Sequence, residues 1–297
     1  MKKTAKVKFG ALNIKTHPHP TPEIYANLIE FVHKKELIGP LRGHTAGRID
    51  ALFPISSNNR LAGYTGKIGK WTRIDNVYSK QKEKFFTQEE VEKLFPGVED
   101  AQALPNYERS DFVFYPEKHK LIFVSYHNHA GHRQHLTPGI AGRLFDNLFN
   151  HPTVQANFHQ DVEVVVIPDN NVLERILNLY DLQKIEICVN RPNKGDDLED
   201  DDDIVFNALN RIHVKEERRI YKAAKGQSID PDEEMKRYAR VAADNGFVKA
   251  IGKDEYGNRV EESTVDKPLL ETLEYDAQKE SLGSNLLSLA AKILGLL

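Results

Sequence analysis

The chain has 297 residues, of which 40% are hydrophobic and 29% charged, and its formal net charge is −3 at pH 7. This is the composition of an ordinary soluble protein, long enough for one large domain or two modest ones. No apolar run approaches the roughly 18 residues of a membrane-spanning helix, so no membrane partner is expected. The single cysteine, Cys188, excludes an intrachain disulfide and a multi-cysteine metal site, and it indicates a reducing, cytoplasmic environment.

The N-terminal third predicts strands and two capped helices. Lys and hydrophobic residues alternate over 7–15, which is typical of a strand. Thr21-Pro22 then supplies a cap and a first-turn proline for a helix over 22–35. Two strands follow over 47–55 and 61–68, and Thr87 with Glu90 forms a capping box for a helix over 87–95.

The middle of the chain has the clearest pattern. Strands are predicted over 112–115 and 121–126, a helix capped by Thr137-Pro138 extends to 149, and a buried strand covers 162–167. A helix over 169–180 and a strand around Cys188 complete a β-β-α-β-α-β order. This order predicts an α+β fold: a mixed, largely antiparallel sheet with helices packed on it.

The C-terminal third begins with an acidic run over 196–203, for which a solvated linker is predicted. Helices are expected over 204–225 and 231–245, then a hairpin from strands 247–251 and 259–264. The predicted organisation is therefore an α+β sheet domain over 1–195, the linker 196–203, and a helical and hairpin lobe over 204–297.

An apolar helix is predicted over 282–297. Its leucine and isoleucine stripe must pack against the rest of the chain or a second copy, because one lysine is too little for binding to anionic lipid.

Charge is segregated along the chain. Residues 1–84 hold 16 Lys and Arg against 6 Asp and Glu, whereas the remaining 213 residues hold 25 against 38. A basic region with interleaved aromatic residues suits nucleic acid, since cations neutralise phosphates and aromatic rings stack on bases. The alternative is a solvated basic surface whose aromatic residues belong to the core. The candidate nucleic-acid-binding residues are Arg42, Arg48, Arg60, Lys67, Lys70, Trp71, Arg73 and Lys80.

Four histidines lie within nine residues, between a predicted strand and a predicted helix. Histidine is a common metal ligand, and a loop between rigid elements can gather several around one ion. However, the spacing matches no known zinc pattern and no carboxylate lies nearby, so neither a metal nor a cofactor is predicted. A metal-dependent phosphodiesterase or nuclease remains the alternative, centred on His127, His129, His132 and His135.

The arrangement of elements resembles that of a known family. The strand pair 112–116 and 121–126, the capped helix 137–149, the strand 162–167 and the segment 242–250 together look like a bacterial family found in prophages and defence loci. In outline they are also similar to the RexA-like DNA-binding proteins of lambdoid superinfection exclusion. The resemblance lies in the order of elements, so it carries over no individual site residue.

The resemblance implies a role in phage exclusion, through DNA binding by a homodimer. It also favours a second copy of the chain as the partner of the apolar helix 282–297. Combined with the basic region, it predicts a non-enzymatic nucleic-acid-binding component of anti-phage defence. The expected partners are nucleic acid, with DNA favoured over RNA, a second copy of the chain, and a phage or defence-system protein. A third alternative is a homodimeric module that recognises a phage protein without binding nucleic acid.

Overall fold

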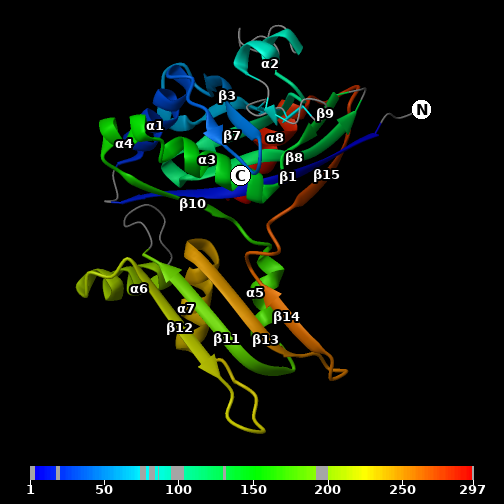
Figure 1. Ribbon diagram of the computed structural model, residues 1–297. Helices are drawn as coiled ribbons and strands as arrows, with labels where there is room; N and C mark the ends of the chain where they lie inside the picture. The colour runs from blue at the N-terminus through cyan, green and yellow to red at the C-terminus, as the bar shows by residue number, and fades with distance from the viewer. Residues whose placement is uncertain are drawn as a thin grey trace.

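The computed structural model describes residues 4–17, 21–73, 78–79, 84–85, 87–94, 104–129, 132–191 and 200–295. These residues form two main sheets, one above the other in Figure 1, and each sheet has helices packed on it. Every strand pairing in the described chain is antiparallel. The predicted α+β class is therefore confirmed.

The first sheet is built on the long strand β1 (Thr4–His17). One edge of β1 pairs with β8, and the other edge pairs with two strands placed end to end, β15 and β10. The order across the sheet is β10-β1-β8-β7-β4-β3-β2. Its other strands are β2 (Gly39–Pro40), β3 (Thr45–Pro54), β4 (Tyr64–Thr72), β7 (Glu108–Tyr115), β8 (Lys120–His129), β9 (His132–His135), β10 (Asp161–Val166) and β15 (Glu271–Asp276).

Helices cover both faces of this sheet. The face that we call the α3 face carries α1 (Pro22–Lys34), α3 (Pro138–Phe149) and α4 (Pro152–Phe158), each of which has proline in its first turn. The opposite face, the α8 face, carries α8 (Leu282–Ile293), which packs over β7 and β8. Alternating strand residues therefore enter two separate cores, with Phe112 and Phe123 in one and Val113 and Val124 in the other.

The second sheet has the strand order β12-β11-β13-β14. Helix α7 packs on β11 and β13, and its apolar residues form a third core with those of the sheet. The elements are α5 (Asn170–Leu177), β11 (Asp181–Asn190), α6 (Asp200–Arg211), β12 (Glu216–Lys222), α7 (Glu233–Asn245), β13 (Gly246–Lys253) and β14 (Arg259–Ser263).

The second sheet is an insertion into the first. The chain leaves the first sheet after β10 and returns to it at β15, and the two crossing segments pair at Pro168 and Pro268. We call residues 4–167 and 268–295 the first lobe and residues 170–264 the second lobe. The expected domains 1–195 and 204–297 differ from this division, since β11 lies in the second lobe and both β15 and α8 lie in the first.

Helix α8 packs on its own chain. Leu286 and Ala290 are buried against the α8 face, and Leu282, Leu287 and Leu289 pack around them. The apolar stripe is therefore used within the first lobe, and the interpretation that a second copy covers it is wrong. No helix in the described chain is both long and apolar enough to cross a membrane.

Two C-terminal expectations are wrong. The acidic run is not a linker throughout, because α6 begins at Asp200, and Asp201 makes ion pairs of 2.8 and 2.7 Å with Arg237 and Arg240 of α7. Acidic residues favour the first turn of a helix, where they face its positive end. The predicted helix 204–225 ends at Arg211, and β12 follows as a charged edge strand paired with β11. Residues 192–199 lie outside the described residues.

Candidate nucleic-acid interface

Three neighbouring strands place one arginine on each side of a glycine. Arg48 of β3 is opposite Gly69 of β4, and Gly69 is opposite Arg109 of β7. Ile49 and Ile68, the neighbours of Arg48 and Gly69 in their strands, point into the core of the α3 face. Successive strand residues point to opposite faces, so the row formed by Arg48, Gly69 and Arg109 lies on the α8 face. Among the described elements, α8 packs over β7 and β8 and not over β3 and β4.

The space above Gly69 is filled by the carboxylate of Asp50. A Cβ atom at residue 69 would collide with that carboxylate, so the glycine is needed for this close approach. Asp50 lies at an irregularity of β3, where the pairing with β4 shifts between Ile49 and Ala51. Its side chain is only 9% exposed, and it accepts a 2.8 Å hydrogen bond from Arg48 Nε.

Tyr107 links Asp50 to the second arginine. Its hydroxyl donates to Asp50 and accepts a 3.0 Å hydrogen bond from Arg109 Nε. The Arg109 guanidinium also lies 5.5 Å from the centre of the Tyr107 ring. Burial, and then the bond to Asp50, raises the pKa of Tyr107, so the hydroxyl is neutral at physiological pH.

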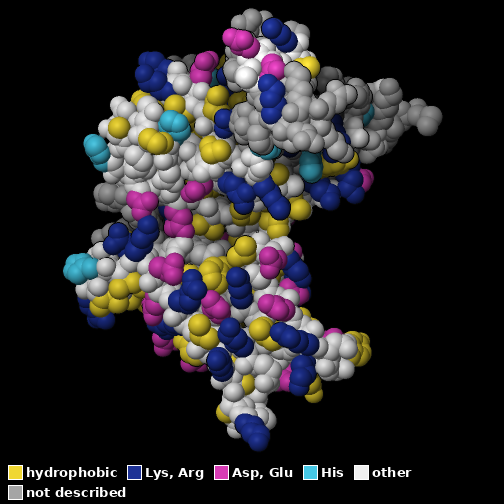
Figure 2. All heavy atoms as spheres, viewed as in Figure 1, with side chains coloured by type: hydrophobic (Ala, Val, Ile, Leu, Met, Phe, Trp, Pro, Cys, Tyr) yellow, Lys and Arg dark blue, Asp and Glu magenta, His cyan; other side chains and the backbone are white. Residues whose placement is uncertain are grey.

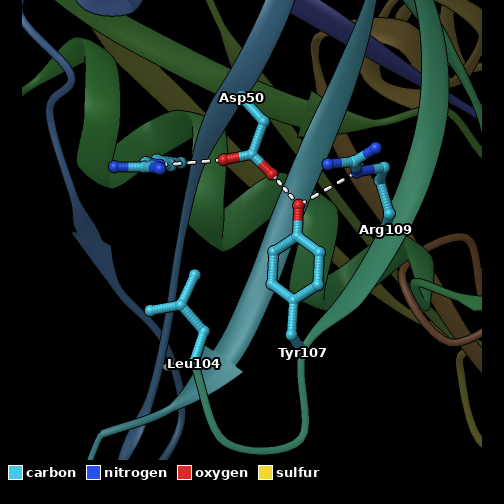
Figure 3. Close-up of a pocket in the computed structure, with 5 residues that line it drawn as sticks. Asp50, Leu104, Tyr107 and Arg109 are labelled. Carbon is cyan, nitrogen blue, oxygen red and sulfur yellow. Dashed lines mark hydrogen bonds and ion pairs between the residues drawn. The ribbon is translucent and has the colours of Figure 1, made fainter. Parts of the chain in front are cut away.

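These residues line a pocket of about 400 Å³, together with Leu104. Figure 3 shows the Tyr107 hydroxyl between the Asp50 carboxylate and Arg109, with Leu104 and the Tyr107 ring side by side below Asp50. The Arg48 guanidinium is also 5.9 Å from the ring of Trp71, which is 7% exposed. The pocket therefore combines two cations with an apolar wall.

A smaller hollow of about 190 Å³ lies beside Arg42, Lys70 and Trp71 at the same end of β4. The Lys70 ammonium contacts Glu108 at 2.8 Å and donates to the His135 carbonyl at 2.9 Å. The positive charge of Lys70 is thus largely neutralised by contacts within the protein.

The structure brings most of the predicted cations to one end of the first sheet and separates one of them. Arg42 precedes β3 and Arg73 follows β4, which places both at the sheet end that lies away from the β3–β4 turn. Lys67 lies along β4 and pairs with Asp111 at 3.2 Å.

Arg60 is at the β3–β4 turn, where it bonds to Asn27 and Glu30 of α1, so it does not belong to this site. Lys80 lies outside the described residues.

The α3 face contributes a second basic surface beyond its helices. Tyr126 is 38% exposed and lies between Lys8 of β1 and His135 of β9. Lys8 and Arg133 are also exposed. Figure 2 shows Lys and Arg side chains gathered across the middle of this view, below the helices of the first lobe.

The expected histidine loop is a β-hairpin. His127 and His129 lie on β8, and His132 and His135 lie on β9. His127 is buried and bonds to the Tyr275 hydroxyl at 3.0 Å, whereas His135 packs against Tyr126 on the opposite face. The pairing of strands separates these two side chains because successive residues point to opposite faces. Within the described chain, no three metal-ligating side chains are grouped closely enough to hold an ion.

A comparison with known protein families matches most of the chain. The family model described as a domain of unknown function, DUF4747, matches residues 5–291. The chain belongs to the DUF4747 family. The match extends from β1 into α8, so the inserted second lobe is part of the DUF4747 unit. No curated protein matches the chain.

Sequence reasoning missed Tyr107, Arg109 and Arg133 because it confined the basic region to residues 1–84. The signal for Arg109 was the alternation Arg109-Ser110-Asp111-Phe112, which places Arg109 and Asp111 on the face opposite Phe112. That signal extends the predicted strand toward the N-terminus, but it does not identify β4 as the partner.

Proposed function

We propose that this DUF4747 protein is a non-enzymatic nucleic-acid-binding component of bacterial anti-phage defence, acting in the cytoplasm. The observation that carries the binding proposal is the Arg48–Arg109 pair, which lies on either side of Gly69 on the α8 face and lines a pocket. Among the described residues, Arg109 has no acidic partner in contact, and its guanidinium is held in place by Tyr107. Cations held in place in this way suit phosphate groups.

Exposed cations elsewhere on the first lobe also support a polyanionic ligand. Among the exposed arginines of the first lobe, Arg42, Arg109, Arg133 and Arg143 have no hydrogen bond or ion pair to an acidic side chain of the described chain. In the second lobe, by contrast, most of the described arginines pair with Asp or Glu, among them Arg218, Arg219, Arg237 and Arg240, whereas Arg211 does not. An unpaired cation can neutralise a phosphate without first giving up a protein partner, so the first lobe is the better surface for nucleic acid.

The test is a binding assay against duplex DNA, single-stranded DNA and RNA. Replacing Arg42, Arg109 and Arg133 with alanine should weaken binding about tenfold or more, since each of them is expected to contact a phosphate. The matched control replaces Lys222, Lys225 and Arg259, which are exposed cations of the second lobe, and removes the same charge. Equal affinity of the two triple variants would contradict the proposal. Comparison of the three ligands also decides whether DNA is preferred.

The defence role and the homodimer rest on the resemblance to prophage and RexA-like proteins. A plating assay of phage on cells with and without the chain tests the first. Light scattering coupled to size exclusion tests the second, and a monomer at tens of micromolar would contradict it. The further partner, a phage or defence-system protein, would be sought by pull-down from infected cells.

A further inference from the structure

The pocket between Arg48 and Arg109 has donors left over after its internal bonds are counted. Each arginine uses its Nε atom within the protein, Arg48 toward Asp50 and Arg109 toward Tyr107. Neither guanidinium makes a further hydrogen bond to the described residues through its terminal nitrogens. A guanidinium carries five N–H donors, so each arginine retains four for a ligand.

The charge of the pocket suits a singly charged ligand. Arg48 and Arg109 contribute two positive charges, Asp50 removes one, and the neutral Tyr107 hydroxyl adds none. The nearest lysine along β4, Lys67, is balanced by Asp111. A net charge of about +1 matches the single negative charge of a phosphodiester better than the double charge of a terminal phosphate.

The size and walls of the pocket suit one nucleotide. Its volume of about 400 Å³ lies within the range of small-ligand sites. Leu104 and the Tyr107 ring form an apolar side against which a sugar or a base can pack (Figure 3). Nucleotides inside a duplex stay stacked on their neighbours, so such a pocket favours a strand whose nucleotides are unpaired.

The donors are also held in place before a ligand arrives. Asp50, whose side chain is 9% exposed, fixes Arg48 directly and Arg109 through Tyr107. Gly69 leaves the room that this carboxylate needs. Arginines held by packing and hydrogen bonds lose less conformational entropy when they bind a phosphate.

We propose that this pocket binds one phosphodiester of single-stranded nucleic acid, with Arg48 and Arg109 bonding to the phosphate oxygens and Leu104 and Tyr107 contacting the attached nucleotide. The assignment rests on the proposed function and adds a specific subsite and a preference for unpaired strands. Tyr107 and Asp50 are positioning residues, since they act through the two arginines.

The experiment measures fluorescence anisotropy with an oligothymidylate of about ten nucleotides and with a duplex of the same length. Arg109→Ala should weaken single-strand binding by about tenfold to a hundredfold and duplex binding by much less. Arg109→Lys keeps the charge but loses the fork of donors, so it should recover only part of the affinity. The exposed position of Arg109 makes both variants compatible with folding, which a thermal melt checks.

Two further arms separate the possible failures. The dinucleotide TpT, which contains one phosphodiester, should compete with the oligothymidylate, whereas thymidine should not. Single-strand affinity that is unchanged by Arg109→Ala but weakened by Arg42→Ala with Arg133→Ala would overturn the pocket and leave the proposed function standing. If Arg109→Ala weakened single-strand and duplex binding equally, Arg109 would act only as a surface charge, and the pocket would likewise be overturned. A wild-type protein that binds no nucleic acid would overturn both proposals.

Discussion

The carboxylate of Asp50 occupies the space that a side chain at Gly69 would fill. This contact joins β3 to β4 on the α8 face and sets the position of the two guanidinium groups around the pocket. This close contact explains why a glycine lies between Arg48 and Arg109. A lysine or arginine at position 69 would add positive charge, but its side chain would collide with Asp50.

The first prediction concerns this contact. Gly69→Ala should lower the free energy of unfolding by about 1–3 kcal/mol, because the new methyl group must displace Asp50 or shift β3. It should also weaken nucleic-acid binding, since Arg48 loses its fixed partner. Gly139→Ala is the control: its Cβ meets no other atom within 4 Å and lies in α3, where alanine should be neutral or stabilising. Urea unfolding of both variants measures the difference.

The second prediction is a salt dependence. The logarithm of the affinity for duplex DNA should fall linearly with the logarithm of salt concentration, with a slope of about −0.9 for each phosphate contacted. Replacing Arg48, Lys67, Lys70 and Arg73 with alanine should make that slope shallower, and the part due to Lys67 and Lys70 should be small because both are already paired with acids. Affinity that does not change with salt would argue against phosphate contacts.

The third prediction concerns the C-terminal helix. Leu286→Ala should lower the free energy of unfolding by about 2–5 kcal/mol, because Leu286 is 2% exposed in the core beneath α8. Ser288→Ala, on the exposed side of the same helix, should change it by less than about 0.5 kcal/mol. Chemical denaturation compares the two variants. A Leu286→Ala protein as stable as wild type would mean that α8 does not pack as described.

The fourth prediction is a pH dependence at Tyr107. Burial and the bond to Asp50 raise the pKa of Tyr107 above its ordinary value of 10.0. The native state therefore holds this proton more tightly than the unfolded chain does. The resulting stability is fully present below pH 10.0 and is lost as the pH rises through the native pKa. Wild type should lose more stability than Tyr107→Phe over this alkaline range, as measured by urea unfolding at a series of pH values. Parallel profiles would contradict the assignment.

The fifth prediction concerns Cys188. The thiol is 2% exposed on β11, and burial raises its pKa. A thiol reagent should therefore react with it slowly in the native protein and rapidly in denaturant. The time course of the reaction measures this, and rapid stoichiometric labelling of native protein would indicate that the second lobe opens readily.

Local signals in the sequence determined many of the elements. Thr137-Pro138 marks the start of α3, and the Thr87–Glu90 capping box, which forms both of its hydrogen bonds, marks α2 (Gln88–Leu94). The turn over 254–258 predicts the β13–β14 hairpin. Such signals work because a cap or a tight turn depends on residues within about one helical turn of each other.

The tertiary structure alone decided the arrangement of these elements. Strands β10 and β15 pair with the same edge of β1, and this pairing makes residues 170–264 an insertion. It depends on partners that are far apart in the chain. Arg48 and Arg109 become neighbours across Gly69 only because β4 lies between β3 and β7. Pairing between distant strands is set by the packing of the whole sheet, which a local pattern of residues does not encode.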